Sequence, residues 1–274
     1  MSEGFAGRTG IVTGAAKGIG AATARALVAA GARAALFDVD DKAGQALADE
    51  LGDAAAYWSA DVADWESADS AVEEVSERFG SVDFLVNNAG IAPPRTLANI
   101  PDGDWERVLG VNLTGAFNCT RAAVPYMKEA AGGAIVNISS VAGKNISMLA
   151  GMHYTTSKWG LIGFSRHMAY ELAQFGIRVN IVCPGPTLTP LVEQNLSAEK
   201  RAANAENFPL GRWVMPDDIA NAVMFFLGPG AAMCAGAELI VDGGILIGSG
   251  AAYPDYMEIR GDQPAERKIV RPGE

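Results

Sequence analysis

Tyr154 and Lys158 are residues whose types and spacing could support catalysis, since they lie four positions apart in the segment YTTSK. The segment stands where an amphipathic helix is predicted to begin, and residues i and i+4 share one face of a helix. An ammonium beside a phenol favours the phenolate and lowers the pKa of the phenol, so the two side chains form a candidate acid/base pair. The alternative is an exposed helical turn, and the rest of the chain must decide between them.

A glycine-rich turn, TGAAKGIG, follows the first predicted strand and carries Gly14, Gly18 and Gly20. Glycine lets the backbone turn sharply and approach a ligand closely, and the N-terminus of the helix beyond it attracts a pyrophosphate. The spacing is GxxxGxG and differs from the GxGxxG of other dinucleotide-binding folds. Its place directly after a strand favours a nucleotide-binding loop over an ordinary turn.

Asp38 ends the second predicted strand. A carboxylate at that position can accept hydrogen bonds from the adenosine ribose and would repel a 2′-phosphate, so it selects NAD over NADP. The alternative is an ordinary turn aspartate, since Asp40 and Asp41 follow. Lys17 in the glycine loop is counter-evidence, because a cation there could help to bind a 2′-phosphate. The carboxylate should outweigh it, since the phosphate would face a like charge.

Further polar residues stand where other elements end. Asp61 and Val62 follow the third predicted strand, and Asn87-Asn88-Ala89-Gly90 follows the fourth. Ligands bind at the carboxyl ends of strands in open α/β sheets. Asn112 interrupts a predicted helix, where its propensity is poor, and Ser139-Ser140 closes the strand AIVNI. Each of these could be a cap or a turn when taken alone.

The elements that must position these residues alternate along the chain. Strands are predicted at 9–13, 33–37, 54–58, 82–86, 134–139, 179–183 and 238–241. Helices are predicted at 19–30, 42–51, 65–79, 105–130 (one or two), 155–175 and 216–227. Strands separated by helices of this length imply right-handed crossovers, so the sequence predicts an α/β fold with a doubly wound parallel sheet in a single domain. The extension at 253–274 is irregular, and we expect it to be mobile or docked on another subunit.

Composition excludes several classes of function. A chain of 274 residues with 49% hydrophobic content can bury a large core, while a net charge of −11 disfavours nucleic acid or an anionic membrane as a partner. Three cysteines without CxxC and two histidines without HExxH predict no metal site. The N-terminus lacks the features of a signal peptide, and the apolar stretch 222–252 is broken by Pro, Gly and acidic residues. We therefore expect a cytoplasmic protein.

Taken together, the motifs favour an acid/base pair over an exposed helical turn at YTTSK. TGxxxGIG, NNAG, an asparagine inside a helix, a serine at a strand end, YxxxK and PG occur in the order seen in short-chain dehydrogenases/reductases, which the chain resembles over about residues 5–248. The resemblance implies a Rossmann-type fold, with residues 1–252 as the dinucleotide-binding and catalytic domain. It also implies a catalytic tetrad of Asn112, Ser140, Tyr154 and Lys158. Ser140 is preferred to Ser139 because the family's serine directly precedes a segment like Val-Ala-Gly.

The resemblance also implies a role for each residue. Tyr154 is the acid/base at the substrate oxygen, and its phenolate is stabilised by Lys158 and by the oxidised nicotinamide. Ser140 donates a hydrogen bond to that oxygen, and Asn112 alters its helix locally and holds a water of a proton relay. The cofactor is NAD, and the residues expected to bind it are Gly14, Lys17, Gly18, Ile19, Gly20, Asp38, Asp61, Val62, Asn88, Ala89, Gly90, Tyr154, Lys158, Pro184, Gly185, Thr187 and Thr189.

The implied function is an NAD(H)-dependent alcohol dehydrogenase or carbonyl reductase. One alternative is an NAD-using epimerase or dehydratase, although such enzymes usually carry a separate substrate domain. The other is a nucleotide-sensing regulatory protein of the same fold, which would be expected to lose the tetrad. The substrate is expected under the segment at about 190–213, and the apolar borders of that segment favour a cyclic or hydrophobic secondary alcohol. Arg95 could meet a carboxylate or lie on the surface, and the expected substrate contacts are Ser140, Met148, His153, Tyr154, Leu191 and Trp213.

The family also implies a homotetramer. In it, the two helices expected at 105–130 and 155–175 pair with their symmetry mates, and a second interface forms around the last strand and helix. The matching segments AVMFFL at 222–227 and ILIG at 245–248 are unusually apolar for a surface.

Overall fold

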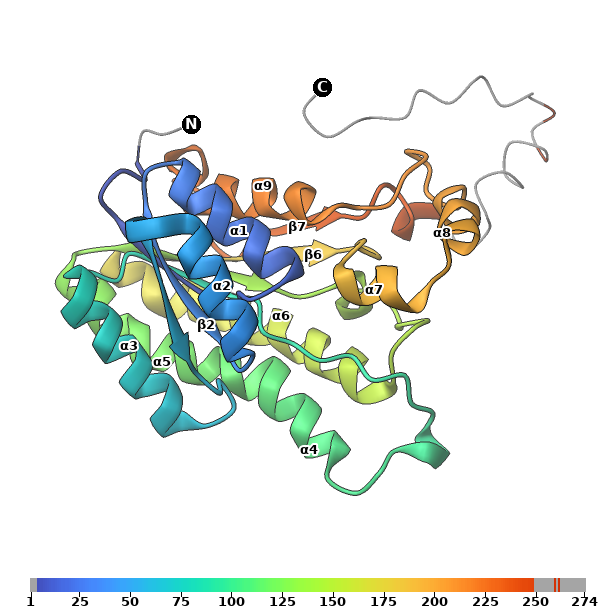
Figure 1. The fold of residues 1–274 in the computed structure, drawn as a ribbon, viewed down its shortest axis with the longest axis horizontal. Coiled ribbons are helices and arrows are strands. Elements are labelled where there is room, and N and C mark those ends of the chain that lie inside the picture. Colours follow the sequence, from blue (N-terminus) through green and yellow to red (C-terminus); the bar gives the residue numbers. More distant parts are fainter. Residues whose placement is uncertain (1–3, 249–258, 260, 262–274) are drawn as a thin grey trace.

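Parallel strands form the centre of the computed structural model, which describes residues 4–248, 259 and 261 (Figure 1). Within residues 4–248 there are seven strands in the order β3-β2-β1-β4-β5-β6-β7, and every neighbouring pair is parallel. Their bounds are β1 (Thr9–Thr13), β2 (Arg33–Asp38), β3 (Ala55–Ser59), β4 (Phe84–Asn87), β5 (Gly133–Ile138), β6 (Ile177–Pro184) and β7 (Glu238–Val241).

Helices cover both faces of this sheet (Figure 1). They are α1 (Gly18–Ala29), α2 (Asp41–Leu51), α3 (Trp65–Phe79), α4 (Asp104–Leu109), α5 (Gly115–Glu129), α6 (Met152–Leu172), α7 (Pro190–Asn195), α8 (Ala198–Ala205) and α9 (Pro216–Leu227). Side chains alternate between the faces of a strand, so Val12 of β1 packs in the core beneath α1, α2 and α9. Its neighbour Ile11 packs in the core beneath α3, α5 and α6.

The structure confirms the predicted doubly wound sheet and refines two helical regions. The pattern at 105–130 forms α4 and α5, which are joined by a π turn at Gly110–Thr114. The helix expected to begin at Thr155 begins at Met152, because Gly151 in an extended conformation serves as its N-cap. Tyr154 therefore lies inside α6. The predicted extension at 253–274 lies outside the described residues, apart from Ile259 and Gly261.

The segment 190–213 contains two helices, α7 and α8, that the sequence does not predict. Helix α7 begins at Pro190, since the first helical position needs no N–H donor. Helix α8 follows Ser197, whose side chain accepts a hydrogen bond from the backbone N–H of Lys200. Both signals are local caps on helices of only 6 and 8 residues. A pattern this short is hard to distinguish from a loop by periodicity.

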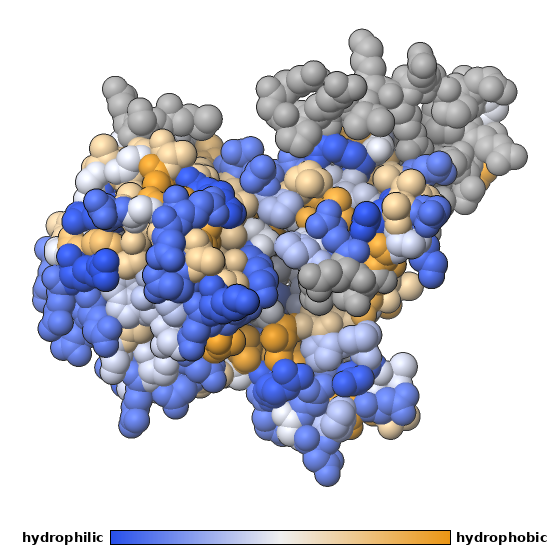
Figure 2. Space-filling model, viewed as in Figure 1, coloured by the Kyte–Doolittle hydropathy of each residue, from blue (hydrophilic) through white to orange (hydrophobic). Residues whose placement is uncertain are grey.

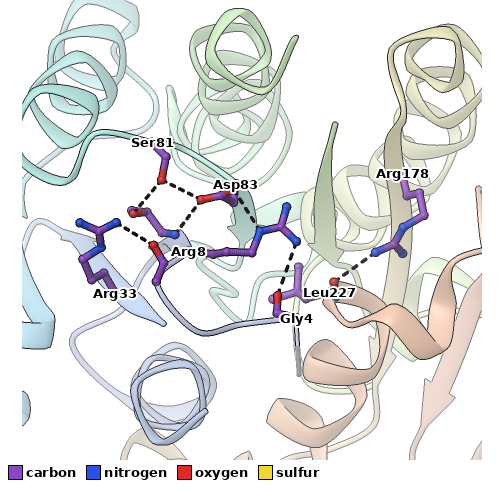
Figure 3. Close-up of polar contacts among 9 residues, drawn as sticks. Gly4, Arg8, Arg33, Ser81, Asp83, Arg178 and Leu227 are labelled. Carbon is purple, nitrogen blue, oxygen red and sulfur yellow. Dashed lines mark hydrogen bonds and ion pairs between the residues drawn. The ribbon is translucent and has the colours of Figure 1, made fainter. Parts of the chain in front are cut away.

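Polar side chains fasten the amino-terminal edge of the sheet (Figure 3). Arg8 donates to Asp83 at 3.0 Å, and the other carboxylate oxygen of Asp83 accepts from the backbone N–H of Thr9 and from Ser81, both at 2.8 Å. Arg178 donates to the carbonyl of Phe226 at 2.6 Å and to other carbonyls at the end of α9. The amino-terminal ends of the strands are therefore occupied by hydrogen bonds that hold the fold together. The candidate functional residues lie at the opposite, carboxyl-terminal ends of the strands.

Candidate active site

The glycine loop between β1 and α1 is held by the turn that follows β4. Gly14 and Gly18 have φ angles of +61° and +57°, which favour glycine. A Cβ atom on Gly20 would lie 2.2 Å from the carbonyl oxygen of Gly14, so a side chain there would disrupt the loop. The Asn88 amide donates to the carbonyls of Thr13 and Gly14 at 2.9 and 3.0 Å. The loop is thus a backbone cradle of the kind that accommodates a pyrophosphate.

Thr13 is a residue of this site that sequence reasoning missed. Its hydroxyl accepts hydrogen bonds from the backbone N–H groups of Asn88 and Ala89, both at 3.0 Å. Its side chain is almost fully buried, at 1% exposure. A threonine that ends a buried strand beside a glycine turn was the available signal, because its hydroxyl needs a partner there. Thr13 joins the glycine loop to the NNAG segment.

Asp38 lies beside the glycine loop at the end of β2. Its two carboxylate oxygens accept from the backbone N–H groups of Ala16 and Asp40, at 2.9 and 3.0 Å. Lys17 is bound by Asp40, with 2.5 Å between Nζ and Oδ2. The hydrogen bond to Asp40 raises the pKa of Lys17, and the same bond lowers the pKa of Asp40. Lys17, the cation that could have helped to bind the 2′-phosphate of NADP, is therefore paired with the carboxylate of Asp40.

Asp61 and Val62 lie after β3, on the same edge of the sheet. Asp61 is exposed, and its carboxylate accepts from the backbone N–H of Ala63 at 2.9 Å, which fixes the turn. Val62 is buried, and its carbonyl accepts from the Asn118 amide at 2.9 Å. Asn118 of α5 is a second positioning residue that the sequence did not identify.

Asn112 lies in the π turn between α4 and α5, which is the local change expected of its helix. Its side chain is buried, accepts from the backbone N–H of Ile91 at 2.8 Å and donates to the carbonyl of Ile91 at 3.0 Å. It also donates to the Ser157 hydroxyl at 3.0 Å. The side chain therefore links the loop after β4 to α6, next to Lys158.

Ser139 and Ser140 have different partners. The Ser139 hydroxyl donates to the backbone carbonyl of Lys158 at 3.0 Å, so it serves the packing of α6 on β5. The Ser140 hydroxyl accepts from the backbone N–H of Ala142 at 3.0 Å and is also hydrogen-bonded to the Tyr154 side chain. Ser140, and not Ser139, thus faces the tyrosine.

Lys158 is buried, and its ammonium donates to the carbonyl of Ile138 at 2.8 Å and lies 5.7 Å from the centroid of the Tyr154 ring. Burial lowers the pKa of Lys158 to about 8. Burial also raises the pKa of Tyr154, and the hydrogen bond with Ser140 opposes this increase. The sequence led us to expect a lowered pKa for Tyr154. In the protein alone the pKa is raised, because desolvation of the phenol has a larger effect than the hydrogen bond with Ser140.

The PGPTLT segment lies across the glycine loop. The Gly185 backbone N–H donates to Val241 at 2.9 Å, and a Cβ atom on Gly185 would lie 2.7 Å from Cβ of Asp242. Thr187 donates to the carbonyl of Gly185 at 2.9 Å. A Cβ atom on Gly18 would lie 3.2 Å from the methyl group of Thr189. The segment after Pro184 is thus packed between β7 and the glycine loop.

Two of the expected substrate contacts are buried. His153 is fully buried and its Nε2 lies 3.4 Å from Asp104, because at the start of α6 its ring points toward α4. Trp213 is only 8% exposed, donates to the carbonyl of Arg201 at 2.8 Å and packs on Phe208. Both side chains are therefore parts of the core.

The other expected substrate contacts differ in their surroundings. Met148 is 85% exposed and is available to a ligand. Leu191 lies in α7, but its side chain lies outside the described part of the structure. Nε of Arg95 is 3.7 Å from Asp104, and its side chain remains 42% exposed. Among the residues that the structure describes, no group of three His, Cys, Asp or Glu side chains could hold a metal ion.

A phenol, a hydroxyl and a buried ammonium thus meet beside a backbone cradle, an arrangement that can exchange a proton with a bound oxygen atom.

A family model described as enoyl-(acyl carrier protein) reductase matches residues 14–246. An uncharacterised short-chain type dehydrogenase/reductase of Sinorhizobium fredii is 38% identical over 248 residues, covering 88% of this chain and 98% of its own.

Two further proteins resemble the chain over a similar length. Cis-4-hydroxycyclohexanecarboxylate dehydrogenase of Sinomonas cyclohexanicum is 41% identical over 247 residues, covering 89% of this chain and 98% of its own. The crystal structure of a 3-ketoacyl-(acyl-carrier-protein) reductase from Brucella melitensis, complexed with NADH, matches with a TM-score of 0.81 and 32% identity. The match covers 88% of this chain and 99% of that one.

Proposed function

The chain belongs to the short-chain dehydrogenase/reductase family, and from this premise we propose that it transfers a hydride between NAD(H) and a secondary alcohol or ketone. The observation that carries the proposal is the contact between Tyr154 and Ser140, with the Lys158 ammonium beside the tyrosine ring. The glycine loop, Asp38, Asp61, Val62, the NNAG turn and the segment from Pro184 to Thr189 are proposed to hold the cofactor.

The nicotinamide would supply or accept the hydride, and the protein would handle the proton. The Ser140 hydroxyl donates a hydrogen bond to the substrate oxygen, where charge changes during the reaction. Tyr154 gives its phenolic proton to that oxygen in reduction and takes it back in oxidation. Lys158 holds the resulting phenolate by charge, and Asn112 holds the backbone of Ile91 and the α6 residue Ser157 in place.

We propose a cyclic or hydrophobic secondary alcohol as the substrate. Figure 2 shows apolar surface beside a hollow on the face seen in Figure 1. The segment before α6 exposes Ile146, Met148 and Leu149, at 68%, 85% and 71%, and so offers apolar contacts near Tyr154. The relative from Sinomonas is named for a substrate with a hydroxyl group on a cyclohexane ring.

Initial rates with NAD and a panel of cyclic, steroid-like and linear alcohols test the proposal. We expect turnover of secondary cyclic alcohols with formation of NADH. Tight binding of NADH without turnover of any alcohol or ketone would instead support the nucleotide-sensing alternative.

Preference for NAD over NADP is expected to depend on Asp38. Asp38→Asn removes the charge that a 2′-phosphate would face, and we expect kcat/KM with NADP to rise about tenfold or more, which corresponds to roughly 1.4 kcal/mol. The matched variant Asp40→Asn frees the Lys17 ammonium and should give a smaller gain. Kinetics with both cofactors check this, and equal efficiency of the wild-type protein with the two would contradict it.

We also propose a homotetramer that acts in the cytoplasm. Phe117 of α5, Tyr170 of α6 and Phe225 of α9 are 46%, 91% and 47% exposed, and large exposed apolar surface is typical of interfaces. Among the described residues, no helix is long and apolar enough to cross a bilayer.

Light scattering is expected to give about four times the chain mass of 28.5 kDa. Phe225→Glu should reduce this mass to that of a dimer, because only one of the two proposed interfaces contains α9. A monomer of the wild-type protein at micromolar concentration would rule out the tetramer.

A further inference from the structure

His153 directly precedes Tyr154 and is completely buried between α4 and α6. Its Nδ1 accepts a hydrogen bond from the backbone N–H of Tyr154 at 2.9 Å. Its Nε2 lies 3.4 Å from Oδ2 of Asp104, the first residue of α4. The imidazole therefore bridges the backbone of the proposed acid/base residue and a carboxylate on another helix.

These contacts define the protonation of the ring. A ring nitrogen accepts a hydrogen bond only when it carries no proton, so Nδ1 is unprotonated and the proton is on Nε2. The polar group that lies near that nitrogen is the carboxylate of Asp104, with Oδ2 at 3.4 Å. The hydrogen bond from Arg107 and the nearby His153 lower the pKa of the Asp104 carboxyl, so the group that faces the ring is a carboxylate. The contact at Nδ1 thus points to one tautomer of the ring, with its proton on Nε2.

Asp104 connects the elements that surround Tyr154. Its Oδ1 accepts from Arg107 at 2.6 Å, and its Oδ2 faces both His153 and Arg95, the latter with Nε at 3.7 Å. Oδ2 of Asp104 and Nε2 of His153 are both buried, and within the described residues neither atom has a hydrogen-bond partner of good geometry, so the contact at 3.4 Å is the polar contact that each makes with the other. Arg95 belongs to the loop after β4, and the carbonyl of Pro93 in that loop accepts from the N-cap of α6 at 3.0 Å.

We propose that Asp104 and His153 form a positioning pair that sets the direction of the Tyr154 hydroxyl. Tyr154 is in the first turn of α6, where backbone N–H groups lack partners inside the helix and the end can fray. The Tyr154 N–H is shared between the carbonyl of Gly151 at 3.1 Å and the imidazole at 2.9 Å, so the imidazole adds a second acceptor at this end of the helix, and Asp104 fixes the imidazole. This inference rests on the proposed function, because the pair acts through Tyr154.

A small displacement of an acid/base group has a large kinetic effect, since about 1 Å of misplacement can cost roughly 10²-fold in rate. The expected effect of the pair is therefore on kcat and on the proton-transfer step, with cofactor binding unchanged. A histidine that only filled the core would affect the melting temperature and leave kcat per folded enzyme the same.

Steady-state kinetics of Asp104→Asn and His153→Phe separate the two roles. We expect kcat to fall about 10- to 100-fold with an increased solvent isotope effect, while the Kd for NADH changes less than about twofold. His153→Gln keeps a donor toward Asp104 and should recover part of kcat. Matched controls are Asp102→Asn and His167→Asn, and His167 is an exposed residue of the same helix. If both pair variants kept kcat within threefold while their melting temperatures fell, the proposal would be overturned.

A second measurement does not depend on activity. The chain contains only two histidines, so nitrogen-15 spectra of histidine-labelled protein can be assigned with the His167→Asn variant. We expect the spectrum to show the proton of His153 on Nε2 and an unprotonated Nδ1. A proton on Nδ1 would overturn the positioning pair and leave the proposed function standing. A wild-type protein with the expected tautomer but no turnover of any alcohol or ketone would overturn the proposed function instead.

Discussion

Replacing Tyr154 by phenylalanine is expected to lower kcat by about 10³-fold or more, because general acid/base groups typically contribute about 10²–10⁴. The change deletes only the hydroxyl that is hydrogen-bonded to Ser140 and keeps the ring beside Lys158. The glycine loop and Asp38 are untouched, so the Kd for NADH should stay within about twofold. Stopped-flow turnover and NADH fluorescence titration measure the two quantities.

Tyr170→Phe is the matched control, since Tyr170 lies on the same helix with 91% exposure. It should turn over like the wild type. Retention of more than a few per cent of activity by Tyr154→Phe would show that another group moves the proton.

Lys158→Met is expected to abolish turnover and yet leave the protein without bound cofactor at least as stable as the wild type at pH 7. The phenolate would lose its charge partner, which accounts for the loss of activity. Burial lowers the pKa of Lys158 from 10.5 to about 8, so holding its ammonium in the fold costs about 3 kcal/mol. The variant removes that cost and leaves the carbonyl of Ile138 without its donor, a loss of about 1–3 kcal/mol.

The same shift predicts how stability changes with pH. Because the pKa is lower in the folded protein, the unfolded chain binds more protons between about pH 8 and pH 10.5, and stability increases with pH through this window. Relative to Lys158→Met, the wild type should gain about 2 kcal/mol between pH 8 and pH 10. Urea unfolding of both proteins tests this, with the exposed Lys42→Met as the control. A constant difference across the window would mean that Lys158 is not desolvated.

The sequence was sufficient to predict the strands of the sheet and the polar residues at their carboxyl-terminal ends, because both depend on local signals. Strand and helix periods alternate strictly, and Tyr154 and Lys158 share a helix face by their spacing alone. Helices α7 and α8 are too short for a periodic pattern, and Trp213 looked like a wall residue because its burial depends on how that segment folds.

The pairing of His153 with Asp104 also could not be predicted. Nothing near either residue indicates that α4 packs on the start of α6, and a histidine beside the tyrosine of a catalytic motif suggested a substrate contact. The fully buried ring and its distance to the carboxylate became visible only when the two helices were placed together.

Asp83 has a further consequence, for the order in which the protein is assembled during synthesis. Its carboxylate completes the hydrogen bonding of Thr9, and β1 pairs with β4 next to it, although the two segments are far apart in the chain. Until the ribosome has released residues 84–87, β1 can pair only with β2 and its other edge remains open. Contacts of such long range slow folding and leave strand edges available for wrong pairing. The centre of the sheet, which carries the glycine loop, can therefore be completed only after β1, β2 and β3 have been synthesised, and before β5, β6 and β7 are available.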